Sequence, residues 1–187
     1  MRHALTILVL LALAALPAAA QPEMTGATLL HGRTAIAGET RDVRFEFLCS
    51  SNERNATGAL IVNLIIPRHA ELRPAFDFDV FEGPDANAGA RTRIETQGAP
   101  GRFAVSGWIG VAADQPFIFG LSATRRRDAA RLAELGRLLR PLTAGAGTLT
   151  WTQGNARAGG PEIVARLEVG AEDAARLRSA LGPCLAR

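Results

Sequence analysis

Several residue types that carry protein chemistry are absent from this sequence or scarce in it. The 187 residues include no lysine, no tyrosine, two cysteines and three histidines. All 21 basic residues are therefore arginines, and the 18 acidic residues leave a formal net charge of only +3. A complete preference for arginine is typical of GC-rich coding, and so small a net charge gives little support to nucleic-acid binding. We therefore expect no nucleic-acid partner.

Sequence motifs of catalysis and cofactor binding are also absent. The chain has no GxSxG, CxxC or HExxH motif, no P-loop and no GxGxxG fingerprint. Beyond the N-terminus the histidines are His31 and His69, and neither has the spacing of a zinc site. The sequence thus predicts no metal and no cofactor and favours a non-enzymatic function. A Ser-His-Asp triad, which forms from residues distant in sequence, stays open.

Long apolar runs are missing too. Beyond residue 16 none approaches the ~18 residues that a membrane-spanning helix needs. The run at residues 4–16 follows Arg2 and precedes three alanines at residues 18–20, a pattern typical of a signal peptide cleaved between Ala20 and Gln21. We expect residues 1–20 to be removed and residues 21–187 to form a single soluble domain in a bacterial periplasm or the extracellular medium. An uncleaved N-terminal anchor is the alternative, and no integral membrane protein is expected.

The two cysteines, Cys49 and Cys184, both lie beyond this signal. An even number of cysteines in an exported chain indicates a disulfide, because the compartment is oxidising. The sequence therefore predicts a bond between Cys49 and Cys184. A pair of buried free thiols is the alternative.

The periodicity of the apolar residues predicts about six to eight strands, most of them ahead of two helices. The helices are expected over residues 128–140, capped by Asp128, and 171–181, and to end at Pro141 and at Gly182-Pro183. This order favours an α+β fold, a mainly antiparallel sheet with two helices in the C-terminal third, over a β-sandwich with appended helices. Strands are expected over residues 42–49, 59–66, 76–81, 92–96, 103–109, 117–121, 148–153 and 162–169, with an edge strand near 27–30.

The segment FDFDVFEGPD, residues 76–85, holds the densest group of acidic side chains: Asp77, Asp79, Glu82 and Asp85. On a strand, Asp77 and Asp79 would lie on one face about 7 Å apart. Two carboxylates at that spacing could hold a cation or act as the acid and base of a glycosidase. The alternation alone also accounts for them as a solvated outer face, and we favour that interpretation.

The basic run Arg125, Arg126 and Arg127 precedes the first expected helix. Positive charge there opposes the helix dipole, so stability does not explain its position. The run could grip an acidic group, or it could be a solvated turn, which we favour. The two tryptophans, Trp108 and Trp151, could stack on a sugar or pack in the core.

The layout of residues 129–184 resembles a known family. A leucine-rich helix is followed by a glycine-containing turn, a strand at Thr148–Trp151, a second strand at Ile163–Val169, and Gly170 with an Ala/Leu helix. This order is similar to the end of invasion-associated locus B-type periplasmic proteins of alphaproteobacteria. The N-terminal half does not match that family's two-cysteine opening. The resemblance implies a small exported envelope protein without known catalysis.

Together these features favour a soluble periplasmic protein that binds an envelope protein or a small ligand and is not an enzyme. A small glycan hydrolase using carboxylates of the Asp77–Asp85 segment is the alternative function. Binding of an anionic polymer through Arg125, Arg126 and Arg127 is a third hypothesis, which predicts a steep salt dependence.

Overall fold

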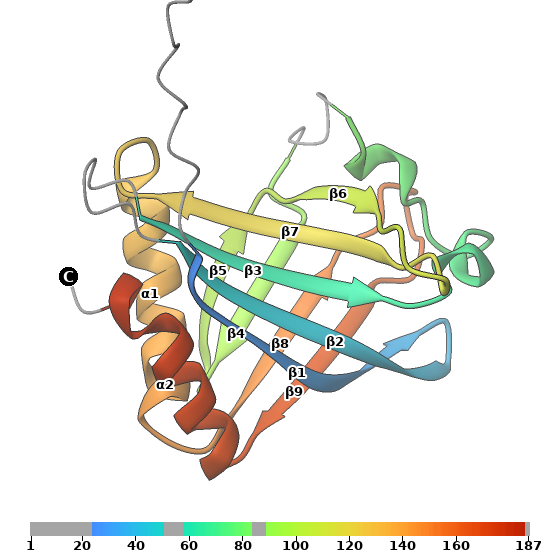
Figure 1. The fold of residues 1–187 in the computed structure, drawn as a ribbon. Helices are drawn as coiled ribbons and strands as arrows, with labels where there is room; N and C mark the ends of the chain where they lie inside the picture. The colour runs from blue at the N-terminus through green and yellow to red at the C-terminus, as the bar shows by residue number, and fades with distance from the viewer. Residues whose placement is uncertain (1–23, 51–57, 84–88, 186–187) are drawn as a thin grey trace, which may run out of the picture.

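A computed structural model describes residues 24–50, 58–83 and 89–185 (Figure 1). Within them all strands belong to one nine-stranded sheet in the order β5-β4-β8-β9-β1-β2-β3-β7-β6, and neighbouring strands are antiparallel. The α+β expectation is confirmed. The sandwich alternative is wrong, because the strands form one curled sheet rather than two. The strands are β1 Met24–Ile36, β2 Glu39–Ser50, β3 Ala59–Ile66, β4 Thr92–Thr96, β5 Ala99–Phe103, β6 Ser106–Ile109, β7 Phe117–Thr124, β8 Gly147–Gln153 and β9 Ile163–Val169.

Two helices, α1 (Ala129–Ala144) and α2 (Ala171–Leu185), lie together at one end of the curled sheet (Figure 1). Helix α2 contacts β1 and β2 in the middle of the strand order. Helix α1 contacts β7 towards one end of that order and β4 and β5 at the other. The helix thus connects the two sides that the curl brings towards each other.

The core fills the concave face of the sheet. Val43, Phe45 and Phe47 of β2 point inward, as the alternation in that strand predicts, and all are buried. Strand β3 is apolar almost throughout because both its faces are largely covered, and its inward residues are fully buried. The helices contribute a row of buried leucines to the same core: Leu135, Leu138, Leu139, Leu142, Leu177 and Leu181.

The strand expected at residues 76–81 is absent. The segment is irregular and ends in a short 3₁₀ turn, Asp79–Phe81, which follows another, His69–Leu72. Phe76, Phe78 and Phe81 are buried, whereas Val80 is 39% exposed. Phe78 packs on Phe117 of β7 with ring centroids 4.8 Å apart. Burial of three aromatic rings against β7 therefore determines the backbone path, and the alternation of the sequence does not mark a strand.

Both helices run beyond their expected ends. Helix α1 includes Pro141 and continues to Ala144, and α2 includes Gly182 and Pro183 and continues to Leu185. A proline near the C-terminus removes one helical hydrogen bond, and here it does not stop the last turn. The extra turn of α2 carries Cys184 towards the sheet.

Two strand boundaries also differ from the prediction. Strand β1 is a long central strand between β9 and β2, not an edge strand near residues 27–30. Residues 103–109 contain the end of β5 and all of β6, which lie at opposite ends of the strand order. The single strand expected there is wrong because the chain crosses between the two edges at residues 104–105.

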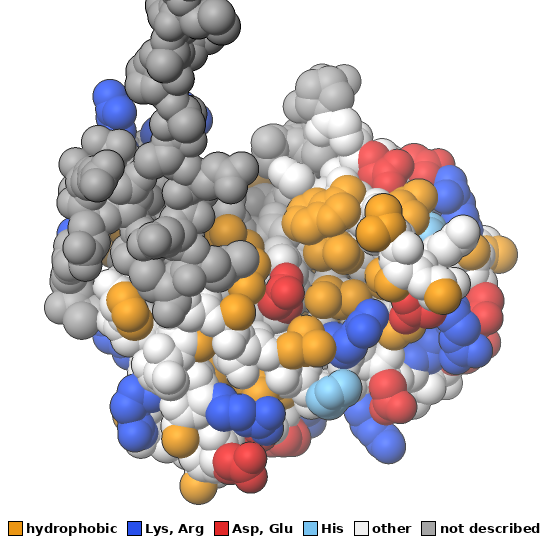
Figure 2. Space-filling view, in the orientation of Figure 1, with side chains coloured by type: hydrophobic (Ala, Val, Ile, Leu, Met, Phe, Trp, Pro, Cys, Tyr) orange, Lys and Arg blue, Asp and Glu red, His pale blue; other side chains and the backbone are white. Residues whose placement is uncertain are grey.

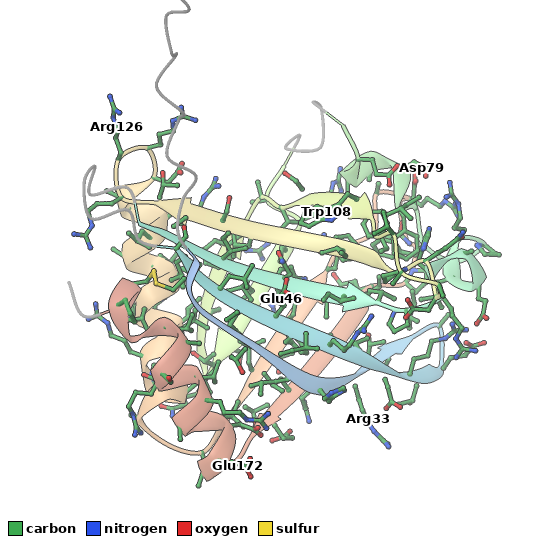
Figure 3. The ribbon with its side chains drawn as sticks, viewed as in Figure 1. Arg33, Glu46, Asp79, Trp108, Arg126 and Glu172 are labelled. Atoms are coloured by element: carbon green, nitrogen blue, oxygen red, sulfur yellow. A yellow bond between two sulfur atoms is a disulfide. The ribbon has the colours of Figure 1, made fainter. Side chains whose placement is uncertain are left out.

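The disulfide between Cys49 and Cys184 is confirmed (Figure 3). The Cα atoms are 5.9 Å apart, within the normal range for a disulfide. Cys49 is fully buried near the end of β2, and Cys184 lies in the last turn of α2. The bond therefore fixes the end of the C-terminal helix to the middle of the sheet.

Candidate functional site: a groove along helix α1

A groove of about 640 Å³ runs along α1 beside the end of α2. Its volume lies in the range of small-molecule sites, about 300–1,000 Å³. One side of α1 forms most of it, and α2 contributes only its last residues. The lining residues are Arg125, Ala129, Leu132, Ala133, Gly136, Arg137, Arg140, Pro141, Ala144, Cys184 and Leu185.

Small residues on α1 create the depression. Small side chains recur at helical spacing on this face of α1 and leave a depression between its larger side chains; they are Ala129, Ala133, Gly136 and Ala144. A Cβ atom on Gly136 would lie 3.5 Å from a methyl group of Leu185, an ordinary van der Waals distance, so the end of α2 lies next to this part of α1. The floor of the groove is therefore apolar, while the leucines on the opposite face of α1 fill the core.

Three arginines, Arg125, Arg137 and Arg140, supply all the charge of the lining. Arg137 donates to the carbonyl oxygen of Pro100 at 3.2 Å, and Arg140 donates to that of Leu185 at 3.1 Å. Carbonyl groups orient a guanidinium without neutralising it. No carboxylate of the described residues forms an ion pair with these three side chains. Within residues 24–50, 58–83 and 89–185, the groove therefore presents positive charge without an ion-pair partner over an apolar floor.

The surrounding sequence reinforces this charge. Residues 125–140 hold six arginines and only two acidic residues, Asp128 and Glu134. Asp128 is the residue that precedes α1, but its side chain makes no capping bond to the helix; it accepts hydrogen bonds from the backbone nitrogen and hydroxyl of Thr124. The capping role expected of Asp128 is therefore not seen.

The structure separates the three arginines of the predicted anion patch. Arg125 is half-buried and lines the groove, whereas Arg126 and Arg127 are exposed and lie outside the lining. Arg126 extends away from the sheet at the end of α1 (Figure 3). Arg137 and Arg140, which complete the site with Arg125, were not singled out from the sequence. Their spacing of three on the small-residue face of α1 is the signal that would have indicated them.

Asp77, Asp79 and Glu82 of the predicted cation or hydrolase site do not line this groove. Asp79 forms an ion pair with Arg73 on the exposed surface, and the backbone nitrogen of Asp77 donates to the Asn155 side chain at 3.4 Å. Glu82 is exposed, and Asp85 lies outside the described residues. Within the described part of the chain no group of three or more His, Cys, Asp or Glu side chains could hold a metal ion.

Other side chains that could serve a functional site are instead hydrogen-bonded within the protein. The His69 ring is buried, with Nδ1 2.7 Å from the carbonyl oxygen of Gln115. Trp151 is fully buried and donates to Gln153 at 3.3 Å, so it is a core residue. Arg41 hydrogen-bonds to Glu39 and Glu71, and the hydrogen bond to Glu39 is the main cause that raises the pKa of Arg41 above its usual value.

Comparison of the chain with known protein families, curated proteins and solved structures finds no match. The resemblance to invasion-associated locus B-type proteins therefore stays a prediction. Among the described helices none is both long and apolar enough to cross a bilayer. Residues 1–20, the expected signal peptide, lie outside the described residues.

Proposed function

We propose that this chain is an exported periplasmic binding protein, not an enzyme, and that the α1 groove takes an anionic amphiphile, an acidic head group on an apolar chain. The lining carries the proposal, because among the described residues three arginines and no acidic residue surround an apolar floor. Guanidinium groups bind carboxylates and phosphates through charge-assisted hydrogen bonds, which are about twice as strong as neutral ones. The alanines and leucines would contact the apolar chain.

Export has separate support. The N-terminal sequence has the three parts of a signal peptide, and the disulfide suits an oxidising compartment. The family resemblance implies the same class, a small envelope protein without known catalysis. The hydrolase hypothesis has no geometric support from Asp77 and Asp79 and stays a prediction.

The decisive experiment titrates the mature protein, residues 21–187, with decanoate by calorimetry. Decanol serves as the uncharged probe of the same chain length. We expect decanoate to bind at least about tenfold more tightly than decanol, because hydrogen bonds to charged groups contribute about 1.5–3 kcal/mol. Equal binding of the two probes, or no binding of either, would overturn the proposal.

The neighbours Arg125 and Arg126 provide a matched pair of variants. Arg125→Gln removes a positive charge from the groove, and Arg126→Gln removes the same charge one residue away, outside it. We expect a loss of about tenfold in decanoate affinity for Arg125→Gln and a change below about twofold for Arg126→Gln. Similar losses for both would indicate general electrostatic attraction rather than a site.

A further inference from the structure

The outer face of the sheet carries an exposed tryptophan on β6. Hydrophobic side chains gather over β6 and β7 on this face (Figure 2), and the Trp108 side chain is 43% exposed. A Cβ atom on Gly120 of β7 would lie 2.5 Å from Cζ3 and 2.7 Å from Cη2 of this ring. The six-membered ring therefore rests directly on the backbone of Gly120. Glycine at this position lets the ring sit close to the sheet, with its remaining surface open to solvent.

A row of polar side chains continues from this ring across the sheet. Gly120 pairs with Asn63 of β3, and Asn63 pairs with Glu46 of β2. The side-chain nitrogen of Asn63 donates to a carboxylate oxygen of Glu46 at 2.7 Å. The bond fixes both planar groups next to the tryptophan. Glu46 itself is only half-buried, so its carboxylate remains accessible.

The Asn63 side chain has unused hydrogen-bonding capacity at this place. The residue is only 4% exposed, and its Oδ1 atom has no hydrogen-bond partner among the described residues. The same atom would be 3.2 Å from a Cβ on Gly120, which places it next to the Trp108 ring. A buried acceptor without a partner costs about 1–3 kcal/mol, and because this atom is closed off from the surface, a ligand donor reaches it only where the adjacent Trp108 ring shifts aside.

One further polar group lies in the neighbouring row of the same face. Arg44 of β2 pairs with Ile65 of β3, and its Nη2 atom is 3.4 Å from a carboxylate oxygen of Asp114. The buried Nε atom of Arg44 likewise has no hydrogen-bond partner in the part of the chain that the structure describes. The face therefore offers an exposed aromatic ring and the accessible carboxylate of Glu46, with the unpartnered Asn63 Oδ1 and Arg44 Nε atoms buried beside them. These side chains include neither a catalytic nucleophile nor a cluster of metal ligands, so they suit binding and not catalysis.

We propose that this surface, Trp108, Gly120, Asn63 and Glu46 with Arg44 beside them, binds a pyranose unit of a glycan. A pyranose presents C–H groups on one face, which pack against an aromatic ring, and hydroxyl groups around its rim, which both donate and accept. Those hydroxyls match the accessible Glu46 carboxylate and the half-buried Arg44 guanidinium, and a hydroxyl that enters beside the ring would meet the buried Asn63 acceptor. A cationic ligand fits less well, because Arg44 would repel it. None of these residues lines the α1 groove, so the two proposals fail independently.

Intrinsic fluorescence gives a direct assay, because Trp108 is exposed and the other tryptophan, Trp151, is fully buried. The probes are cellohexaose, chitohexaose and maltohexaose at millimolar concentration, added to the mature protein. We expect at least one of them to shift the emission to shorter wavelength in a saturable way, as the ligand displaces water from the Trp108 ring. No response to any of the three by fluorescence or calorimetry would overturn the proposal.

Variants locate the binding. By calorimetry Trp108→Ala should weaken affinity about tenfold or more, and Trp108→Phe should retain part of it. Ile109→Ala is the matched control, since Ile109 is 44% exposed and next in sequence, and it should leave affinity within about twofold. Gly120→Ala, which displaces the ring without removing it, should weaken binding as Trp108→Ala does. Equal losses in the Ile109 and Trp108 variants would contradict the assignment.

Tetramethylammonium tests the alternative that this surface binds a cation. If it binds in a way that depends on Glu46 while no saccharide binds, the sugar proposal is overturned in favour of a cationic ligand.

Discussion

Loss of the disulfide should destabilise the protein strongly. The bond closes a loop between residues 135 positions apart, Cys49 and Cys184. In the chain-entropy model a loop of that length corresponds to about 5 kcal/mol at 25 °C. For a chain of this size about 1 kcal/mol shifts the melting temperature by about 2–4 °C, so the double variant Cys49→Ala/Cys184→Ala should melt about 10–20 °C lower. Cys49 is fully buried, so alanine is preferable to the more polar serine.

Circular dichroism during a thermal ramp measures this shift. The wild-type protein treated with a phosphine reductant provides the control, because it loses the same constraint without a substitution. Reduced wild type and double variant should melt within a few degrees of each other. A decrease below about 3 °C in both samples would refute the reasoning that the bond between α2 and β2 stabilises the fold.

Three further predictions concern the acidic segment, helix α2 and export. Asp77→Asn and Asp79→Asn should each change the free energy of unfolding by no more than about 0.5 kcal/mol in urea titrations, because the ion pair of Asp79 is exposed; a loss above about 1 kcal/mol would contradict this. Gly182→Ala should stabilise by up to about 1 kcal/mol, because α2 continues through this residue and an added Cβ meets no atom within 4 Å; destabilisation would show that the helix ends earlier. Intact mass of the protein from periplasmic extract should correspond to a chain that begins at Gln21, and a full-length cytoplasmic product would refute export.

Strands with a local pattern could be predicted from the sequence. The apolar run at residues 59–66 and the segment 92–96 coincide with β3 and β4, because strand formation there follows from the residues themselves. Residues 76–81 alternate equally well and form no strand. Their partners are phenylalanines of β7, far along the chain, and no local pattern reports on that packing.

The helix ends depended on tertiary contacts in the same way. Pro141 and the Gly182-Pro183 pair are local stop signals, yet both helices continue past them. In α2 the disulfide at Cys184 and the contact between Leu185 and α1 hold the last turn in place.

Only part of the candidate site could be predicted from the sequence. The sequence indicated a possible anion site at Arg125, but the groove also needs Arg137 and Arg140 from α1 and Leu185 from α2. The residues of the outer sheet face come from four strands, so the pairing of β6, β7, β3 and β2 was required to bring them together.

The most direct test of the proposed groove is a titration of ¹⁵N-labelled mature protein with decanoate, followed by amide chemical shifts. We predict saturable changes at Leu132, Gly136 and Leu185, which lie around the groove floor, and in Arg125→Gln changes at the same residues that need about tenfold more decanoate to saturate. Changes confined to Asn63 and Trp108 on the outer sheet face, or no saturable change at any amide, would contradict the account.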